Sequence, residues 1–265
     1  MKSVSLITAV LATALFFCGC DAQSSSEADR YDRQKSLDEG DYDRVLELTN
    51  ACGGDQACLL DRAAAYMGLA GFDAPTIIKA VADSDDDSSD QGYFAKLKPY
   101  IKEDANNTLN HAKNTYESVI KVRSYSTASC ADNVNSVLNK HEKDACANYG
   151  LSVLARSAVL ANKITELYDQ INASGCFTVS ACFGNGTNDE AIVNGLLPDI
   201  IELVFNETDA LIGMIADESA DTKEEVQKIK DEICKNAGKP AGCSSSEVSA
   251  DAALKYILDN RHKDK

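Results

Sequence analysis

Residues 146–171, CANYGLSVLARSAVLANKITELYDQI, carry a long and clear helical pattern. Their large apolar side chains recur mostly three or four residues apart, at Tyr149, Val153, Leu154, Leu160, Ile164, Leu167, Tyr168 and Ile171. This period is typical of an amphipathic α-helix that turns one side toward a core. At a rise of about 1.5 Å per residue the helix would be ~40 Å long, the length of a whole domain. The stretch therefore predicts a helical domain.

Patterns of the same period lie on both sides of this stretch. A stripe over 93–122 predicts another helix, which the pair Asn106-Asn107 either interrupts or leaves continuous. The most apolar segment, 192–215, predicts a buried helix that Pro198 should kink or begin anew. Because the chain has no Trp and only 6% aromatic residues, its core must be aliphatic, which suits helices better than sheets. We therefore expect an all-α fold of antiparallel helical hairpins.

Cysteines indicate how these hairpins are stapled. Beyond Cys18 and Cys20 eight remain, at Cys52, Cys58, Cys130, Cys146, Cys176, Cys182, Cys234 and Cys243. An even number is typical of disulfides in an exported chain. Many connectivities are open, but the spacing favours neighbours (52–58, 130–146, 176–182 and 234–243), each contributing ~2–3 kcal/mol in the chain-entropy model. A metal site is disfavoured because no Cys-x-x-Cys occurs, and a redox pair because the spacings are longer than the usual redox motif.

The chain opens with an apolar run over 4–17, which is shorter than the roughly 20 residues of a membrane-spanning helix. Phe16-Phe17-Cys18-Gly19-Cys20-Asp21 closes this run with a small residue directly before Cys20. The hexapeptide resembles the lipobox of bacterial lipoproteins. The resemblance implies a signal peptide over 1–19, acylation of Cys20, a lipidated tether over 20–30 and a place in the bacterial cell envelope facing the periplasm, on the inner or the outer membrane. The alternative is an ordinary cleaved signal peptide and a secreted protein.

Charge limits the partners of the remaining chain. Removal of 1–19 takes away Lys2, which leaves 25 basic against 42 acidic residues and a net charge of −17. Such a surface repels phosphate backbones and anionic head groups, so we expect no nucleic acid and no membrane contact other than the lipid anchor. The remaining residues, 31–265, are expected to form a single all-helical domain, with possible sub-halves at 31–125 and 126–265.

Two turns near the start of this domain share a pattern. Leu37-Asp38-Glu39-Gly40-Asp41-Tyr42-Asp43 and Ala70-Gly71-Phe72-Asp73 place Gly40 and Gly71 31 residues apart. The region resembles degenerate tetratricopeptide repeats. That resemblance implies stacked helix-turn-helix units with grooves for peptides or partner helices. An irregular helical bundle, in which the glycines simply end helices, is the alternative.

Motifs of catalysis are nearly absent from the sequence. There is no Gly-x-Ser-x-Gly, no Gly-rich phosphate loop and no His-Glu-x-x-His, and Ser118-Val119-Ile120-Lys121 matches Ser-x-x-Lys without its partner motifs. We therefore expect no enzyme, no cofactor and no metal. The expected function is that of a non-catalytic lipoprotein that binds other envelope or periplasmic proteins, as an adaptor or as an assembly or secretion accessory. The alternative is a periplasmic accessory of a transport system, in which the helix at 192–215 lines a cavity for a hydrophobic solute.

Overall fold

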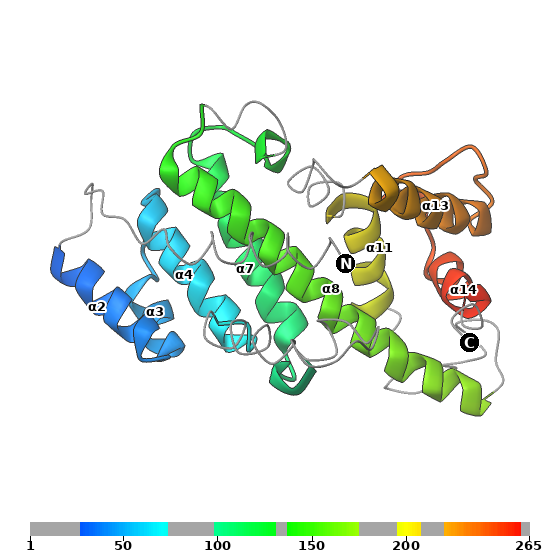
Figure 1. The fold of residues 1–265 in the computed structure, drawn as a ribbon, viewed down its shortest axis with the longest axis horizontal. Helices are drawn as coiled ribbons and strands as arrows, with labels where there is room; N and C mark the ends of the chain where they lie inside the picture. Colours follow the sequence, from blue (N-terminus) through cyan, green and yellow to red (C-terminus); the bar gives the residue numbers. More distant parts are fainter. Residues whose placement is uncertain (1–26, 74–97, 131–136, 175–194, 208–219, 261–265) are drawn as a thin grey trace. The chain divides into compact units, whose positions relative to one another are not determined.

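The structure, a computed structural model, describes residues 27–73, 98–130, 137–174, 195–207 and 220–260 (Figure 1). Every regular element in these ranges is helical, which confirms the predicted all-α fold. The α-helices are α2 (Glu27–Asp38), α3 (Tyr42–Leu48), α4 (Gln56–Leu69), α7 (Ala105–Lys121), α8 (Lys140–Ser174), α11 (Leu197–Glu202), α13 (Ala220–Asn236) and α14 (Ala250–Asn260). Between them lie the 3₁₀ helices η1 (Lys98–Tyr100), η2 (Thr127–Cys130) and η6 (Ser245–Glu247) and the π-helix η5 (Leu203–Glu207). The tetratricopeptide-like arrangement stays a prediction.

The helix bounds bear on three expectations from the sequence. Helix α8 contains the whole predicted stretch 146–171 and is 35 residues long. Helix α7 begins only at Ala105 and then runs unbroken through Asn106-Asn107, so this pair does not interrupt it. Pro198 lies in the first turn of α11, where its missing N–H leaves no hydrogen bond unmade. Gly195 and Leu196, directly before α11, are already helical, and residues 192–194 lie outside the described ranges, so both expectations for Pro198 stay open.

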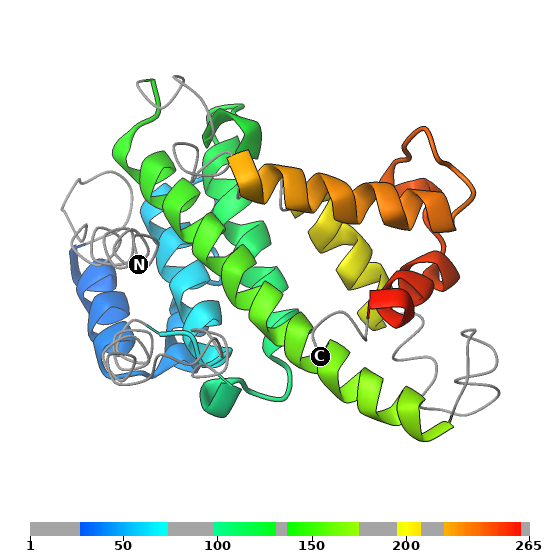
Figure 2. The ribbon, with the colours of Figure 1, turned by 45° about the vertical axis from the view of Figure 1, so that its right-hand side comes forward.

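Two compact units divide the chain within α8, between Ala158 and Val159. Unit 1 contains α2, α3, α4, α7 and the first half of α8. Helices α4, α7 and α8 run alternately in opposite directions in Figures 1 and 2. The core of unit 1 is aliphatic and rich in Ala, as the composition predicts; its fully buried members include Val45, Ala63, Ala65, Leu109, Ala112, Val119, Ile120 and Val153.

Glycines with left-handed backbones end two helices of unit 1. Gly40 has a φ of 73° and Gly71 a φ of 89°. In both turns the next residue donates to the carbonyl five positions earlier, Asp41 N–H to Ser36 O at 2.8 Å and Phe72 N–H to Met67 O at 2.9 Å. This is the Schellman pattern that closes a helix. Gly71 is constrained a second time, because a Cβ there would collide with the Tyr100 carbonyl oxygen.

Unit 2 contains the rest of α8 together with α11, α13 and α14, which Figure 2 draws in yellow, orange and red. Its apolar cluster joins three helices and consists of Leu160, Leu196, Leu197, Ile200, Ile201, Ala253 and Leu254. The described part of the predicted apolar segment 192–215 therefore packs into this core. After α11 the chain continues as the π-helix η5, which has a wider turn than an α-helix. Lys230 of α13 donates to the Phe205 carbonyl of η5 at 3.5 Å.

Three disulfides have the predicted pairing. They join Cys52 to Cys58, Cys130 to Cys146 and Cys234 to Cys243, with Cα–Cα distances of 5.4, 5.5 and 5.5 Å. Each one closes a short loop at a helix end. The fourth predicted pair, Cys176 and Cys182, lies outside the described residues, as does Cys20 of the predicted lipidation site.

Candidate protein-binding surface

The disulfides Cys52–Cys58 and Cys130–Cys146 mark one end of unit 1. Here α4 begins, α7 ends and α8 begins, so these three antiparallel helices each have one terminus at this end. We call it the stapled end and define it as residues 49–58, 119–130 and 137–146. The sequence predicted both staples but gave no sign that they lie at a common end.

A buried carboxylate holds the three helix ends together. The Glu142 side chain is fully buried. Its Oε2 accepts from the Asn139 N–H at 2.7 Å and pairs with Arg123 Nη1 at 3.2 Å, while its Oε1 accepts from Gln56 Nε2 at 3.3 Å. In return, Asn139 Oδ1 accepts from the Glu142 N–H at 2.9 Å, which completes a capping box at the start of α8. A buried charge is tolerated only when it is satisfied in this way.

Gln56 links this carboxylate to the other two helices. Its Nε2 also donates to the Val119 carbonyl of α7 at 3.0 Å, and its Oε1 accepts from Asn139 Nδ2 at 2.9 Å. One side chain at the first position of α4 thus bonds to the end of α7 and to the start of α8. Together with the two disulfides, these hydrogen bonds make the stapled end a preorganised surface whose parts have little freedom to separate.

Exposed apolar side chains lie on this rigid base. Val122 is 43% exposed and Val137 is 55% exposed, and they are two of the three exposed large hydrophobic residues in the described ranges. The third is Tyr31 on α2, at 67%. Exposed apolar residues that gather on one rigid surface are typical of interaction sites, whereas a single one needs no explanation.

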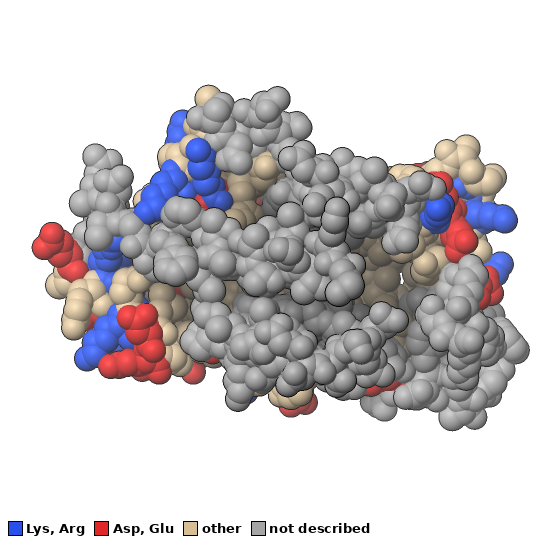
Figure 3. All heavy atoms as spheres, in the orientation of Figure 1, with Lys and Arg blue, Asp and Glu red and all other residues tan. Residues whose placement is uncertain are grey.

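Basic side chains lie close to the two valines in the sequence. Lys121 and Arg123 flank Val122, and Lys140 and Lys143 follow Val137 in the first turn of α8; all four are exposed. We call these six residues (Lys121, Val122, Arg123, Val137, Lys140, Lys143) the basic–valine patch. Figure 3 shows Lys and Arg atoms gathered at the upper left, over the end where α8 begins. The gathering contrasts with the overall excess of acidic residues in the chain, 42 against 26 basic ones.

Acidic neighbours offset part of this charge. Glu117 pairs with Lys121 at 2.7 Å, and the buried Glu142 pairs with Arg123. Asp144 is half-buried, and its burial raises the pKa of its carboxyl group against the opposing effect of Lys140 and His141. The outward charge of the patch therefore comes chiefly from the ammonium groups of Lys140 and Lys143, which are exposed, whereas Lys121 and Arg123 each pair with a glutamate.

A strained turn shapes the patch. Ser124 has a φ of 64° and is the one non-glycine residue with a left-handed backbone in the described part of the chain. This conformation costs on the order of 1–2 kcal/mol for a residue with a Cβ. It is held by the hydrogen bond from the Ser124 N–H to the Lys121 carbonyl at 2.8 Å, and the Arg123 guanidinium lies 5.4 Å from the centre of the Tyr125 ring. Strain of this kind persists where the surroundings fix the chain, often at functional surfaces.

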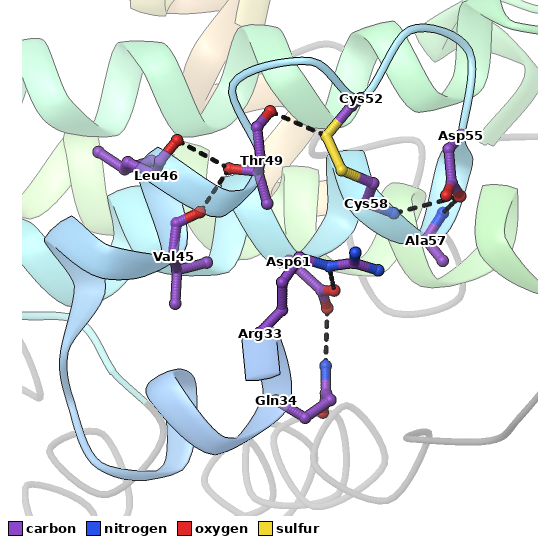
Figure 4. Close-up of polar contacts among 10 residues, drawn as sticks. All are labelled: Arg33, Gln34, Val45, Leu46, Thr49, Cys52, Asp55, Ala57, Cys58 and Asp61. Carbon is purple, nitrogen blue, oxygen red and sulfur yellow. Dashed lines mark hydrogen bonds and ion pairs between the residues drawn. A yellow bond between two sulfur atoms is a disulfide. The ribbon is translucent and has the colours of Figure 1, made fainter. Parts of the chain in front are cut away.

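A second polar cluster in unit 1 connects α2 with α4 (Figure 4). Asp61 Oδ2 pairs with Arg33 Nε at 2.7 Å, and Asp61 Oδ1 accepts from Gln34 Nε2 at 2.7 Å. Burial raises the pKa of the Asp61 carboxyl group, and the opposing effect of Arg33 does not cancel this. Arg33 is 2% exposed, so its guanidinium is out of reach of a ligand from solvent. We interpret this cluster as a clamp on α2.

Neither cluster was found by sequence reasoning. Among 42 acidic residues, nothing marks Asp61 or Glu142 in advance. One local signal existed, because Asn139 and Glu142 have the spacing of a capping box. The histidines offered no better guide: His111 stacks on Tyr66 with ring centres 5.3 Å apart and its side chain is exposed.

The described residues form neither a metal site nor a membrane span. In the ranges that the structure describes, no three His, Cys, Asp or Glu side chains are grouped so that they could hold a metal ion. None of the described helices combines the length and the apolar character that a membrane span requires. Comparison with protein-family models, with curated proteins and with solved structures gives no match to this chain.

Proposed function

We propose that this protein is a non-catalytic, membrane-tethered envelope lipoprotein that binds other envelope or periplasmic proteins, as an adaptor or as an assembly or secretion accessory. The observation that carries the proposal is the stapled end, where two exposed valines lie on a base fixed by two disulfides and a buried hydrogen-bond network. A preorganised surface loses little conformational entropy on binding, which favours recognition of a protein partner.

The tether is part of the same proposal. It rests only on the lipobox-like sequence that ends at Cys20. The three local disulfides support export of the chain, because such bonds persist on the oxidising side of a membrane, but they do not require an anchor. Acylation would hold the protein at the bilayer since each buried methylene contributes about 0.8 kcal/mol. The tetratricopeptide-like interpretation of residues 37–73 adds helical hairpins of a kind that bind peptides.

Cross-linking in intact cells tests the proposal. The full-length chain is compared with its Cys20→Ser variant, and the recovered complexes are separated from the detergent-solubilised envelope. We expect one stoichiometric complex with the native chain, and release of the variant from the membrane fraction. Reproducible recovery of no complex would refute the adaptor, and a membrane-bound Cys20→Ser variant would refute the anchor. The alternative function, a transport accessory that binds a hydrophobic solute, is supported by none of the described residues. A ligand that co-purifies with the protein in native mass spectrometry would favour this alternative over the adaptor.

A further inference from the structure

We propose that the basic–valine patch binds an acidic segment of a partner protein that also carries apolar side chains. This inference rests on the proposed adaptor function and gives its partner a chemistry. The first argument is charge complementarity. Most of the chain repels an acidic segment, since the net charge is −16, whereas the patch combines four exposed basic residues with two exposed valines in the described part of unit 1.

The valines decide between a protein segment and a phosphate-bearing partner. A phosphate backbone would use the lysines but would leave Val122 and Val137 without an apolar contact. An acidic protein segment with Leu, Ile or Phe among its carboxylates can use both. It would bury the valines at the centre of the contact and leave the ammonium groups of Lys140 and Lys143 at the rim, the usual arrangement in protein interfaces.

The lysines, not the helix end, provide the attraction. The start of α8 is already capped, because Asn139 Oδ1 accepts from the Glu142 N–H and the Glu142 carboxylate accepts from the Asn139 N–H. The positive end of the helix dipole thus has a carboxylate in its first turn. Attraction of an acidic segment should therefore depend on Lys140 and Lys143 and should weaken with salt, since exposed charges are screened within about 8 Å at physiological ionic strength.

A charge reversal tests this without unfolding the protein. Lys140→Glu/Lys143→Glu removes two exposed cations from the first turn of α8, and acidic residues near a helix N-terminus are well tolerated. The matched control, Lys102→Glu/Lys255→Glu, alters the net charge equally at two other exposed lysines. Arg123 is left in place because it pairs with the buried Glu142.

The partner is captured with a photo-cross-linking amino acid in the full-length chain in intact cells. It replaces Val137 and, as a control, the similarly exposed Tyr31 on α2. We expect the Val137 position, and not the Tyr31 position, to cross-link to one protein at a peptide rich in Asp and Glu. A synthetic copy of that peptide should bind the wild-type protein and the control variant equally. Binding to Lys140→Glu/Lys143→Glu should be at least ~10-fold weaker, because two attractions at the rim are lost and repulsion replaces them.

Other outcomes overturn the inference. A cross-linked peptide without acidic residues, or equal binding by the charge-reversed and wild-type proteins, would do so. Cross-linking between two copies of this chain would identify a self-association surface instead. Binding to vesicles with 30% phosphatidylglycerol that is lost in Lys140→Glu/Lys143→Glu would assign the patch to lipid head groups. If whole-chain cross-linking still yields a complex while the patch is silent, the adaptor function stands and only this inference fails.

Discussion

Helix α2 is attached to the rest of unit 1 by a buried ion pair, and breaking that pair should release it. The buried residues of α2 are Arg33 and Ser36, so little apolar surface holds the helix in place. Arg33 Nε lies 2.7 Å from Asp61 Oδ2, and the two side chains are 2% and 12% exposed. We predict that Asp61→Ala lowers the free energy of unfolding of unit 1 by about 3 kcal/mol, because it removes a carboxylate partner of the buried guanidinium and leaves that charge less well compensated.

The double substitution Arg33→Met/Asp61→Leu should behave differently. Burial raises the pKa of the Asp61 carboxyl group in spite of Arg33, so removal of the charges from water is the larger effect in this pair. Replacing both charges with apolar side chains of similar volume removes that cost. We expect the double variant to be within about 1 kcal/mol of wild type, although either single change is damaging.

Hydrogen exchange under non-reducing conditions measures the effect where it occurs. Peptides that cover residues 27–38 report the opening of α2, and urea unfolding followed by circular dichroism reports the whole chain. The control is Glu47→Ala, which breaks the ion pair between Arg44 Nη1 and Glu47 Oε2, also 2.7 Å long but 52% and 69% exposed. It should cost no more than about 0.5 kcal/mol. Loss of less than about 1 kcal/mol in Asp61→Ala, or an equal loss in the double variant, would refute the reasoning.

Three further predictions concern a turn, a titrating group and a staple. In urea unfolding, Gly238→Ala should lower the free energy of unfolding by about 1 kcal/mol, and Gly71→Ala should lower it by at least twice as much. Both glycines have a positive φ, but only Gly71 also lacks room for a Cβ. Hydrogen bonds from the Ser244 N–H and from Lys239 lower the pKa of Glu247 from 4.5 to about 2. The ionised carboxylate should therefore stabilise the folded state fully above pH 4.5, and this stabilisation should disappear as the pH falls toward 2. Wild type should therefore lose more stability than Glu247→Gln across that window in acid titrations, and equal losses would contradict the assignment. Cys130→Ser/Cys146→Ser should cost about 3 kcal/mol and Cys52→Ser/Cys58→Ser about 2 kcal/mol in urea unfolding, because the longer loop loses more entropy when closed; the reverse order would contradict the chain-entropy argument.

The parts of the fold that were predictable are those encoded locally. The period of residues 146–171 predicts α8 because neighbouring turns of one helix set the spacing of its apolar face. Nearest-neighbour pairing in the three described disulfides was predictable for a similar reason, since a short loop loses less entropy on closing than a long one. Both arguments need only contacts between residues that are close in sequence.

The candidate surface depends on contacts that are distant in sequence. Gln56 and Glu142 are 86 positions apart, and many acidic residues compete for such a role in the sequence. Exposure of Val122 was not predictable either, because it belongs to the same apolar stripe as the fully buried Val119 and differs from it by lying just beyond the end of α7. The capping boxes Asn139–Glu142 and Ser244–Glu247 were the missed local signals, since both have the required spacing.

The closeness of the paired cysteines has a consequence for biosynthesis. The three described disulfides span 6, 16 and 9 residues and follow one another along the chain without overlap. A chain that grows from its N-terminus at roughly 5–20 residues per second presents both members of each pair within a few seconds, before the next pair emerges. Loops of about ten residues close within roughly 100 ns, so each thiol meets its native partner repeatedly while few competitors exist. Oxidation in the order of synthesis would then form these bonds with little need for reshuffling by an isomerase.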